Sequence, residues 1–187
     1  MGQRGAPEPD GRCDVLVVGA GPTGLALAAQ LSRFGASLRV VDATTERGHE
    51  SRALAVQPRT LEVLRPLGLA DELVRRGNPA GRLRFTAGRG VARAPLLDIG
   101  TEDTAFPLLL LVSQAETEAV LGDHLAARGV PVERGVTFVR SEPDGAGLRC
   151  TLRGAGGAEE VVRVRYLAGC DGARSTCLLY TSDAADE

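Results

Sequence analysis

The residues of this chain best suited to chemistry form a glycine-rich segment of the type G-x-G-x-x-G near the N-terminus. In such a segment the first glycine permits a tight turn, the second lets a phosphate approach the backbone, and the third lets a helix pack closely on a strand. A helix that starts there points N–H groups and the positive end of its dipole at the phosphates. The pattern therefore predicts a binding site for the pyrophosphate of a dinucleotide. Its residues are Gly19, Ala20, Gly21, Pro22, Thr23 and Gly24.

The elements on either side of this segment fit the same interpretation. The run Asp14–Val18 is short and continuously apolar, as expected for a buried parallel strand, and Leu25–Phe34 is predicted to be a helix. A second strand, Leu38–Val41, ends at Asp42, about 20 residues after the glycines. The Asp42 carboxylate can accept hydrogen bonds from both ribose hydroxyls and would repel a 2′-phosphate, which disfavours NADP in this pocket. The sequence thus predicts a dinucleotide-binding β-α-β unit over Asp14–Asp42.

Beyond this unit, helical and strand-like patterns alternate. The polar stretch Thr44–Pro58 is predicted to be a loop. Short strands separated by glycine-rich turns in the second half of the chain indicate an antiparallel meander. A β-α-β unit followed by a meander is typical of a mixed α/β domain, here a Rossmann-like one. The predicted helices are Arg59–Leu67, Asp71–Arg76 and Gln114–Arg128, and the predicted strands are Arg82–Phe85, Leu108–Val112, Val130–Glu133, Thr137–Arg140, Leu148–Leu152, Val161–Val164 and Tyr166–Cys170.

Four segments resemble, in the same order, the FAD-dependent aromatic hydroxylases, the para-hydroxybenzoate hydroxylase-like family of flavin monooxygenases. The first is the β-α-β sequence DVLVVGAGPTGLALAAQLSRFGASLRVVDA. The others are SRALAVQPRTLE, VSQAE at the head of the long helix, and GCDGARS, which is similar to the Asp-Gly motif of the family. They lie at Asp14–Ala43, Ser51–Glu62, Val112–Glu116 and Gly169–Ser175. The resemblance implies a FAD-binding domain of the glutathione reductase-like type.

The resemblance also implies roles for individual residues. Arg52 is expected to lie over the FAD diphosphate or the flavin edge, where a guanidinium matches phosphate oxygens. Gln114 is expected to hydrogen-bond the ribityl or diphosphate region, and Asp171 to act from a strand-end turn near the pyrophosphate. Family members reduce FAD with NADPH or NADH, and the reduced flavin uses O2 to hydroxylate an aromatic substrate such as a phenol or a polyketide. No catalytic residue can be named from these motifs.

Composition narrows the expected partners and location. The net charge is -2 and aromatic residues make up 3% of the chain, so nucleic acid is not an expected partner. The leader Met1–Arg12 is polar, unlike a secretory signal, and no apolar run approaches the roughly 20 residues of a membrane span. The four cysteines and two histidines lie too far apart in the sequence for a zinc site or a disulfide framework, which favours a reducing cytoplasm.

The domain organisation is predicted to be incomplete. Residues 1–12 are interpreted as a disordered leader and residues 13–176 as the FAD-binding domain, with part of the substrate-domain sheet around 82–112. The resemblance stops at Thr176, and the later Gly-Asp motif and the remaining substrate domain of the family do not follow. Residues 177–187 contain no Arg, in a chain rich in it, and are interpreted as a non-native tail. The chain is therefore expected to be the N-terminal part of a longer hydroxylase and inactive by itself.

Other interpretations stay open at this point. A halogenase, an epoxidase or a prenyl reductase would share the FAD-binding fold. Halogenases usually carry a tryptophan-rich motif, and this chain has no Trp. A nonenzymatic FAD- or ADP-binding module would need only the β-α-β unit. An NAD-dependent dehydrogenase conflicts with the GCDGARS segment and with the meander before it.

Overall fold

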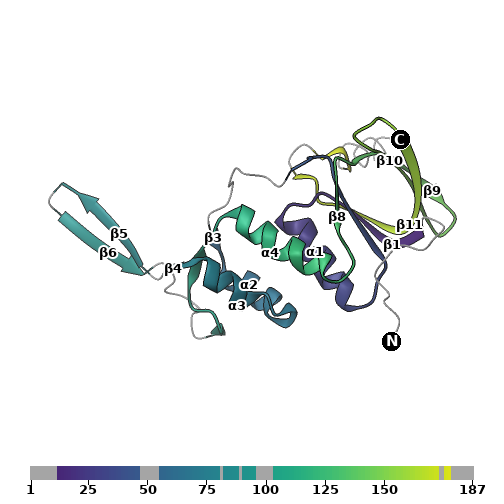
Figure 1. The fold of residues 1–187 in the computed structure, drawn as a ribbon. Coiled ribbons are helices and arrows are strands. Elements are labelled where there is room, and N and C mark those ends of the chain that lie inside the picture. The colour runs from purple at the N-terminus through teal and green to yellow at the C-terminus, as the bar shows by residue number, and fades with distance from the viewer. Residues whose placement is uncertain are drawn as a thin grey trace. The chain divides into compact units, whose positions relative to one another are not determined.

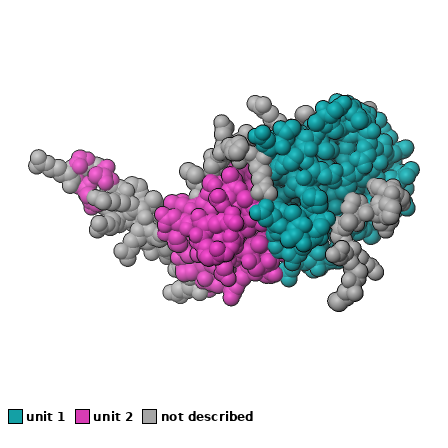
Figure 2. Space-filling model, viewed as in Figure 1, with its two compact units in different colours: residues 1–47, 121–187 teal, residues 48–120 magenta. Residues whose placement is uncertain are grey.

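The computed structural model describes residues 12–46, 55–80, 82–88, 90–95, 103–172 and 175–177. The chain divides into two compact units. The first is made of residues 1–47 and 121–187, and the second of residues 48–120 (Figure 2, teal and magenta). The first unit therefore unites two stretches that the second unit separates in the sequence.

The first unit is a six-stranded mixed sheet with a helix packed on it (Figure 1). Its elements are β1 (Arg12–Val18), α1 (Pro22–Arg33), β2 (Leu38–Asp42), β8 (Val132–Arg134), β9 (Thr137–Asp144), β10 (Gly147–Arg153) and β11 (Glu159–Gly169). The strand order is β8-β2-β1-β11-β10-β9. Strands β8, β2, β1 and β11 pair in parallel, and β11, β10 and β9 form an antiparallel meander. The predicted α/β fold, with a β-α-β unit and a meander, is confirmed.

Strand β1 and helix α1 have sequences that suit their positions. Leu16 and Val17 point to opposite faces of the sheet and neither has exposed surface, so β1 is buried on both sides. Helix α1 begins at Pro22, and the prediction of a start at Leu25 was wrong. Proline is favoured in the first helical turn because its fixed φ suits a helix and its missing N–H costs no hydrogen bond there.

One long strand, β11, replaces two predicted strands. The sequence predicts separate strands at Val161–Val164 and Tyr166–Cys170, but the structure has one strand, Glu159–Gly169. Its first part pairs with β10 and its second part with β1, and both pairings include Arg163 and Val164. Because the two pairings overlap, no break is left at which a turn could form, and the prediction of two strands was wrong.

The parallel strands and the meander share one apolar core. Cys177, in the segment predicted to be a non-native tail, packs against this core with its side chain partly buried. The buried members of the core are Cys13, Leu16, Val18, Val41, Phe138, Cys150, Leu152, Val162 and Val164.

Two glycines let the turn after β1 approach the end of β11. A Cβ atom on Gly19, which has a φ of +103°, would overlap with the carbonyl oxygen of Cys170. A Cβ atom on Gly24 would overlap with the carbonyl oxygen of Gly19 and lie 3.2 Å from the Cβ of Cys170. Both positions therefore require glycine, for the tight turn and for the close packing of helix and strand.

The second unit holds two small sheets and short helices. Strands β3, β7 and β4 form an antiparallel sheet in the order β3-β7-β4, and β5 pairs with β6 as a hairpin. Helix α4 (Gln114–Ala126) begins in this unit and ends in the first. The other elements are β3 (Ala55–Val56), α2 (Pro58–Leu64), η1 (Arg65–Leu67), α3 (Ala70–Arg76), β4 (Asn78–Ala80), β5 (Arg82–Ala87), β6 (Gly90–Pro95) and β7 (Leu109–Leu111).

The second unit differs from the prediction in its shortest elements. Strand β3 lies in the predicted loop Thr44–Pro58, and its two residues are too few to show a strand pattern. The predicted helix Arg59–Leu67 ends as α2 at Leu64 and continues as the 3-10 turn η1, which holds Pro66. Strands β4 and β6 were not predicted. No helix in the described parts of the chain is both long and apolar enough to cross a membrane.

We expect Gly24→Ala to destabilise the first unit. In an exposed helix this change would stabilise the helix by about 1 kcal/mol, because alanine has the higher helix propensity. Here, however, the new methyl group overlaps with the Gly19 carbonyl oxygen. Overpacking of this kind costs about 1–3 kcal/mol. Urea unfolding measures the difference. Gly156→Ala is the matched control, because no described heavy atom lies within 4 Å of a Cβ atom there. Equal unfolding free energies for the two variants would contradict the packing role of Gly24.

Candidate functional site

Seven of the nine cofactor residues predicted from the sequence lie at one edge of the six-stranded sheet, namely Gly19, Gly21, Pro22, Thr23, Gly24, Asp42 and Asp171. Strands β1, β2 and β11 are parallel, so their carboxyl ends lie at the same edge, the usual place for a ligand in such sheets. The N–H of Gly19 donates to the carbonyl oxygen of Val41 at 2.8 Å. A Cβ atom on Gly19 would lie 2.8 Å from the backbone N of Asp171. The structure thus brings the glycine-rich turn, the end of β2 at Asp42 and the Asp171 turn together.

The start of α1 is open to a ligand. Gly21 is its N-cap, and Pro22, Thr23 and Gly24 make up its first turn. Within the described residues, no side chain caps this helix start, and its first turn contains no acid. A Cβ atom built on Gly21 has no described heavy atom within 4 Å. The helix start can therefore present its N–H groups and its positive dipole end to a phosphate in front of Gly21.

Asp42, at the end of β2, faces the same turn. Its Oδ2 accepts a hydrogen bond from the N–H of Ala20 at 2.6 Å, and its Oδ1 accepts from the N–H of Thr44 at 2.8 Å and from the Thr44 hydroxyl. Burial alone would raise the pKa of this carboxyl, but the hydrogen bonds from Thr44 and Ala20 outweigh it and lower the pKa. A carboxylate has about four lone-pair positions. Among the described residues three hydrogen bonds reach this carboxylate, two at Oδ1 and one at Oδ2, and the expected hydrogen bonds from the ribose hydroxyls stay a prediction.

Two residues around Asp42 were missed in the sequence. Arg134, at the end of β8, has its Nη1 3.7 Å from Oδ1 of Asp42 and donates to the Thr44 hydroxyl oxygen at 3.1 Å. This place follows from the pairing of β8 with β2, in which Arg134 lies opposite Asp42. No local pattern predicts that pairing. Thr44 had a signal, because a residue two positions after Asp often donates its N–H to the Asp side chain.

Asp171 lies at this edge too, but its carboxylate bonds to its own chain. Its Oδ1 accepts from the Ser175 hydroxyl at 2.5 Å, and its Oδ2 accepts from the N–H groups of Thr176 at 2.8 Å and Cys177 at 3.4 Å. The carboxylate therefore binds the segment Ser175–Cys177 that follows β11. A contact with the pyrophosphate stays a prediction. In this geometry Asp171 shapes the turn beside Gly19.

The two other predicted cofactor residues belong to other parts of the chain. Arg52 lies outside the described residues. Gln114 begins α4 in the second unit, and its Nε2 donates to Oε1 of Glu118 at 2.7 Å. Ser113 precedes the helix and accepts a hydrogen bond on its Oγ from the N–H of Glu116 at 3.2 Å, which makes it the N-cap. The expected roles of Arg52 and Gln114 toward FAD stay predictions.

The arrangement at this edge suits binding rather than covalent chemistry. The start of α1 can hold a pyrophosphate, and Asp42 can accept a hydrogen bond from a ribose on the β2 side. The thiol of Cys170 lies beside the turn, but burial raises its pKa, so it stays protonated and weakly nucleophilic. These features fit the ADP end of an adenine dinucleotide.

Comparison with known proteins agrees with the geometry. Residues 12–179 match the protein family described as the FAD binding domain. The chain is 43% identical over 173 residues to 6-methylpretetramide 4-monooxygenase of Streptomyces rimosus, over 91% of this chain and 30% of that protein. It is 38% identical over 163 residues to a rifampicin monooxygenase of Streptomyces venezuelae, over 87% of this chain and 32% of that one. The chain thus spans about a third of the length of these relatives.

Solved structures share the fold. The flavin-dependent monooxygenase PieE, in complex with FAD and substrate, gives a TM-score of 0.83 at 33% identity, over 94% of this chain and 33% of that one. The OxyS anhydrotetracycline hydroxylase of Streptomyces rimosus gives a TM-score of 0.79 at 34% identity, over 91% and 34%. The glycine-rich turn and the meander lie where this fold requires them. The chain therefore belongs to the family of FAD-binding domains found in aromatic-hydroxylase monooxygenases.

Proposed function

We propose that this chain binds FAD, with the pyrophosphate at the start of α1 and the adenosine ribose at Asp42. The observation that supports this most strongly is the uncapped helix start at Gly21, where no described heavy atom lies within 4 Å of a Cβ atom built on that residue. Oδ2 of Asp42 is held beside it by the Ala20 N–H. FAD, once bound, supplies the redox chemistry. The residues at this edge bind and orient its ADP end.

We also propose a reaction for a complete protein built on this domain. NADPH or NADH would reduce the FAD, and O2 would supply one oxygen atom to an aromatic ring, of a phenol or a polyketide-like compound. The names of two relatives support this substrate class, 6-methylpretetramide 4-monooxygenase and, at 31% identity, pentachlorophenol 4-monooxygenase of Sphingobium chlorophenolicum. The 187 residues span about a third of the length of these two relatives. For these residues alone, the alternative to hydroxylation is that they bind FAD without catalysing a reaction.

We expect Gly21→Val to abolish ADP binding while the fold stays intact. The new side chain would fill the space in front of the helix start, so a pyrophosphate could not reach the N–H groups. The backbone at Gly21 is extended, so the free energy of unfolding should change by no more than about 1 kcal/mol. Titration calorimetry with ADP and urea unfolding measure the two effects, with Gly156→Val as control. Unchanged ADP affinity would remove this turn from the site.

We expect Asp42→Ala to weaken ADP binding by about 1.5–3 kcal/mol, the effect of losing a hydrogen bond to a charged group. This corresponds to roughly a tenfold to hundredfold increase in Kd. The same titration measures it, and Asp71→Ala, at an exposed acid of the second unit, is the control. A decrease in ADP affinity smaller than about twofold would mean that Asp42 has a structural role at the end of β2 and does not bind the ribose.

The effect of Asp42→Ala should not depend on pH between about pH 5 and about pH 8. Although burial opposes them, the hydrogen bonds to Asp42 hold its pKa below the ordinary value of 3.8, so the group is ionised throughout this range. A carboxylate with a lowered pKa loses its contribution only as the pH falls through that pKa. The ADP phosphates also titrate in this range, but they affect wild type and variant equally, so their effect cancels in the difference between the two binding free energies. A difference that shrinks toward about pH 5 would contradict the lowered pKa.

We expect the 187-residue chain to form no hydroxylated product by itself. Oxygen transfer from a flavin needs a site that excludes water, and the chain spans about a third of the hydroxylases it matches. The measurements are NADPH and NADH consumption, peroxide release and product formation with a panel of phenols. Full-length 6-methylpretetramide 4-monooxygenase, assayed with its own substrate, is the positive control. Coupled product formation by the short chain would overturn this expectation.

A further inference from the structure

A row of polar contacts leads from Asp42 to the strand at the edge of the sheet. Thr44 donates to Oδ1 of Asp42 through its N–H and its hydroxyl. Arg134 donates to the Thr44 hydroxyl oxygen at 3.1 Å and to the carbonyl oxygen of Glu46 at 3.5 Å, and its Nη1 lies 3.7 Å from Oδ1 of Asp42. The Oδ1 side of the carboxylate is therefore held by the chain, and Oδ2 is left on the side of Ala20.

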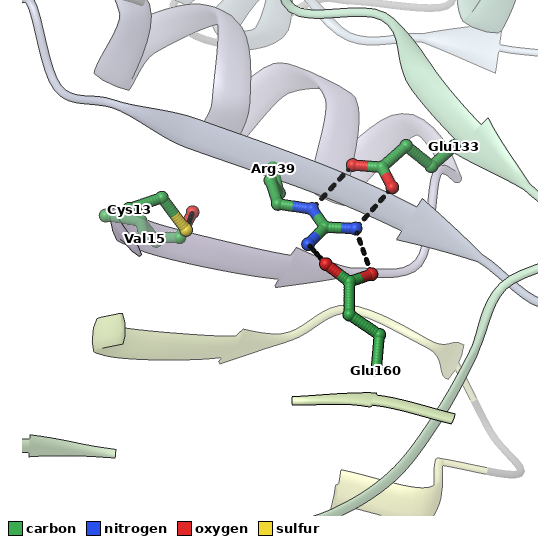
Figure 3. A network of polar contacts seen from close by, with 5 residues as sticks. All are labelled: Cys13, Val15, Arg39, Glu133 and Glu160. Carbon is green, nitrogen blue, oxygen red and sulfur yellow. Dashed lines mark hydrogen bonds and ion pairs between the residues drawn. The ribbon is translucent and has the colours of Figure 1, made fainter. Parts of the chain in front are cut away.

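Arg134 ends β8, a three-residue strand at the end of the described sheet, which needs support beyond its short pairing with β2. Arg39 of β2 supplies it, since its Nε and Nη2 donate to Glu133 at 2.8 and 2.6 Å. Its Nη1 and Nη2 also donate to Glu160 of β11, at 2.7 and 3.0 Å. Figure 3 shows the guanidinium between the two carboxylates. We refer to Arg39, Glu133 and Glu160 as the Arg39 bracket.

The Arg39 bracket fixes position because its central group is nearly buried. The Arg39 side chain is 10% exposed, while those of Glu133 and Glu160 are 32% and 55% exposed. Two-pronged pairing of a guanidinium with a carboxylate sets both distance and direction. A nearly buried charge is strongly destabilising when it loses its partner, so the pairing with Glu133 is kept. Glu133 directly precedes Arg134, and the bracket therefore holds Arg134 opposite Asp42.

We propose that Arg134 is a positioning residue for the adenosine site, held in register by the Arg39 bracket. It keeps Thr44 on Oδ1 of Asp42, so that Oδ2 is presented to the ribose. This role rests on the proposed function, in which Asp42 binds the ribose of FAD. Without Arg134, Thr44 is released and the carboxylate can turn. Affinity for the ribose hydroxyls then falls, while pyrophosphate binding at Gly21 remains.

The test compares two probes, ADP and 2′,3′-dideoxy-ADP, which lacks both ribose hydroxyls. Titration calorimetry on the full chain gives a Kd for each, and their ratio measures what the hydroxyls contribute. We expect a ratio of about tenfold or more for the wild type and a ratio within about twofold of one for Arg134→Gln. Arg153→Gln is the matched control, because it removes an arginine from an exposed ion pair with Glu159 and should keep the wild-type ratio.

The contribution of the Arg39 bracket is tested with Glu133→Gln, and with Glu160→Gln as the more exposed alternative. Each should lower the ratio in a protein that still unfolds cooperatively in urea. A wild-type ratio in both Glu133→Gln and Glu160→Gln would overturn the link between the bracket and Arg134.

The other outcomes separate this role from the proposed function. If Arg134→Gln weakens both probes equally and the ratio stays at the wild-type value, Arg134 acts by charge or stability alone and the positioning role is overturned. A wild-type ratio near one would show that Asp42 does not bind the ribose, which overturns the positioning role but leaves FAD binding intact. Failure of the wild type to bind ADP at all would overturn the proposed function itself.

Discussion

The close approach of the turn after β1 to the end of β11 is the constraint on which the rest of the site depends. The carbonyl group of Cys170 fills the space that a side chain at Gly19 would need, and Gly24 brings α1 against the same turn. Three parallel strands therefore end beside one another, with a helix starting above them. A side chain at either glycine would overlap with a backbone carbonyl oxygen, so the turn, the helix start and the end of β11 could not keep this arrangement.

The same edge holds two acids whose surroundings give them different uses. The Asp171 carboxylate accepts hydrogen bonds from one hydroxyl and two N–H groups, and all three donors lie within the next six residues of the chain. Among the described residues, the Asp42 carboxylate also accepts from one hydroxyl and two N–H groups, but one of these donors is Ala20, 22 residues earlier in the glycine-rich turn. Asp42 therefore joins the end of β2 to the glycine-rich turn, whereas Asp171 stabilises the segment that directly follows it. Residue type alone does not distinguish the two acids, but the partners around them do.

The sequence predicts those parts of the fold that contiguous residues determine. The strand, the glycine turn, the helix and Asp42 follow one another along the chain, and the hairpins of the meander are marked by glycines such as Gly145 and Gly157, both with positive φ. The bonds of Arg39 could not be predicted in this way. Arg39 and Glu160 are 121 positions apart and meet only because β11 returns beside β1. The support of Asp42 by Arg134 depends in the same way on the pairing of β2 with β8.

A nearly buried arginine in β2 is not needed for stability alone. Moving the Arg39 guanidinium and its carboxylates out of water has a free-energy cost that often exceeds the gain from their attraction, and an apolar side chain of similar size would often stabilise such a position as well or better. An apolar contact, however, has no preferred direction. The two-pronged pairs of Arg39 orient β8 and β11 relative to β2 in both angle and distance. The charged pairs therefore control the direction of the strand that carries Arg134, which lies opposite Asp42 at the end of β2.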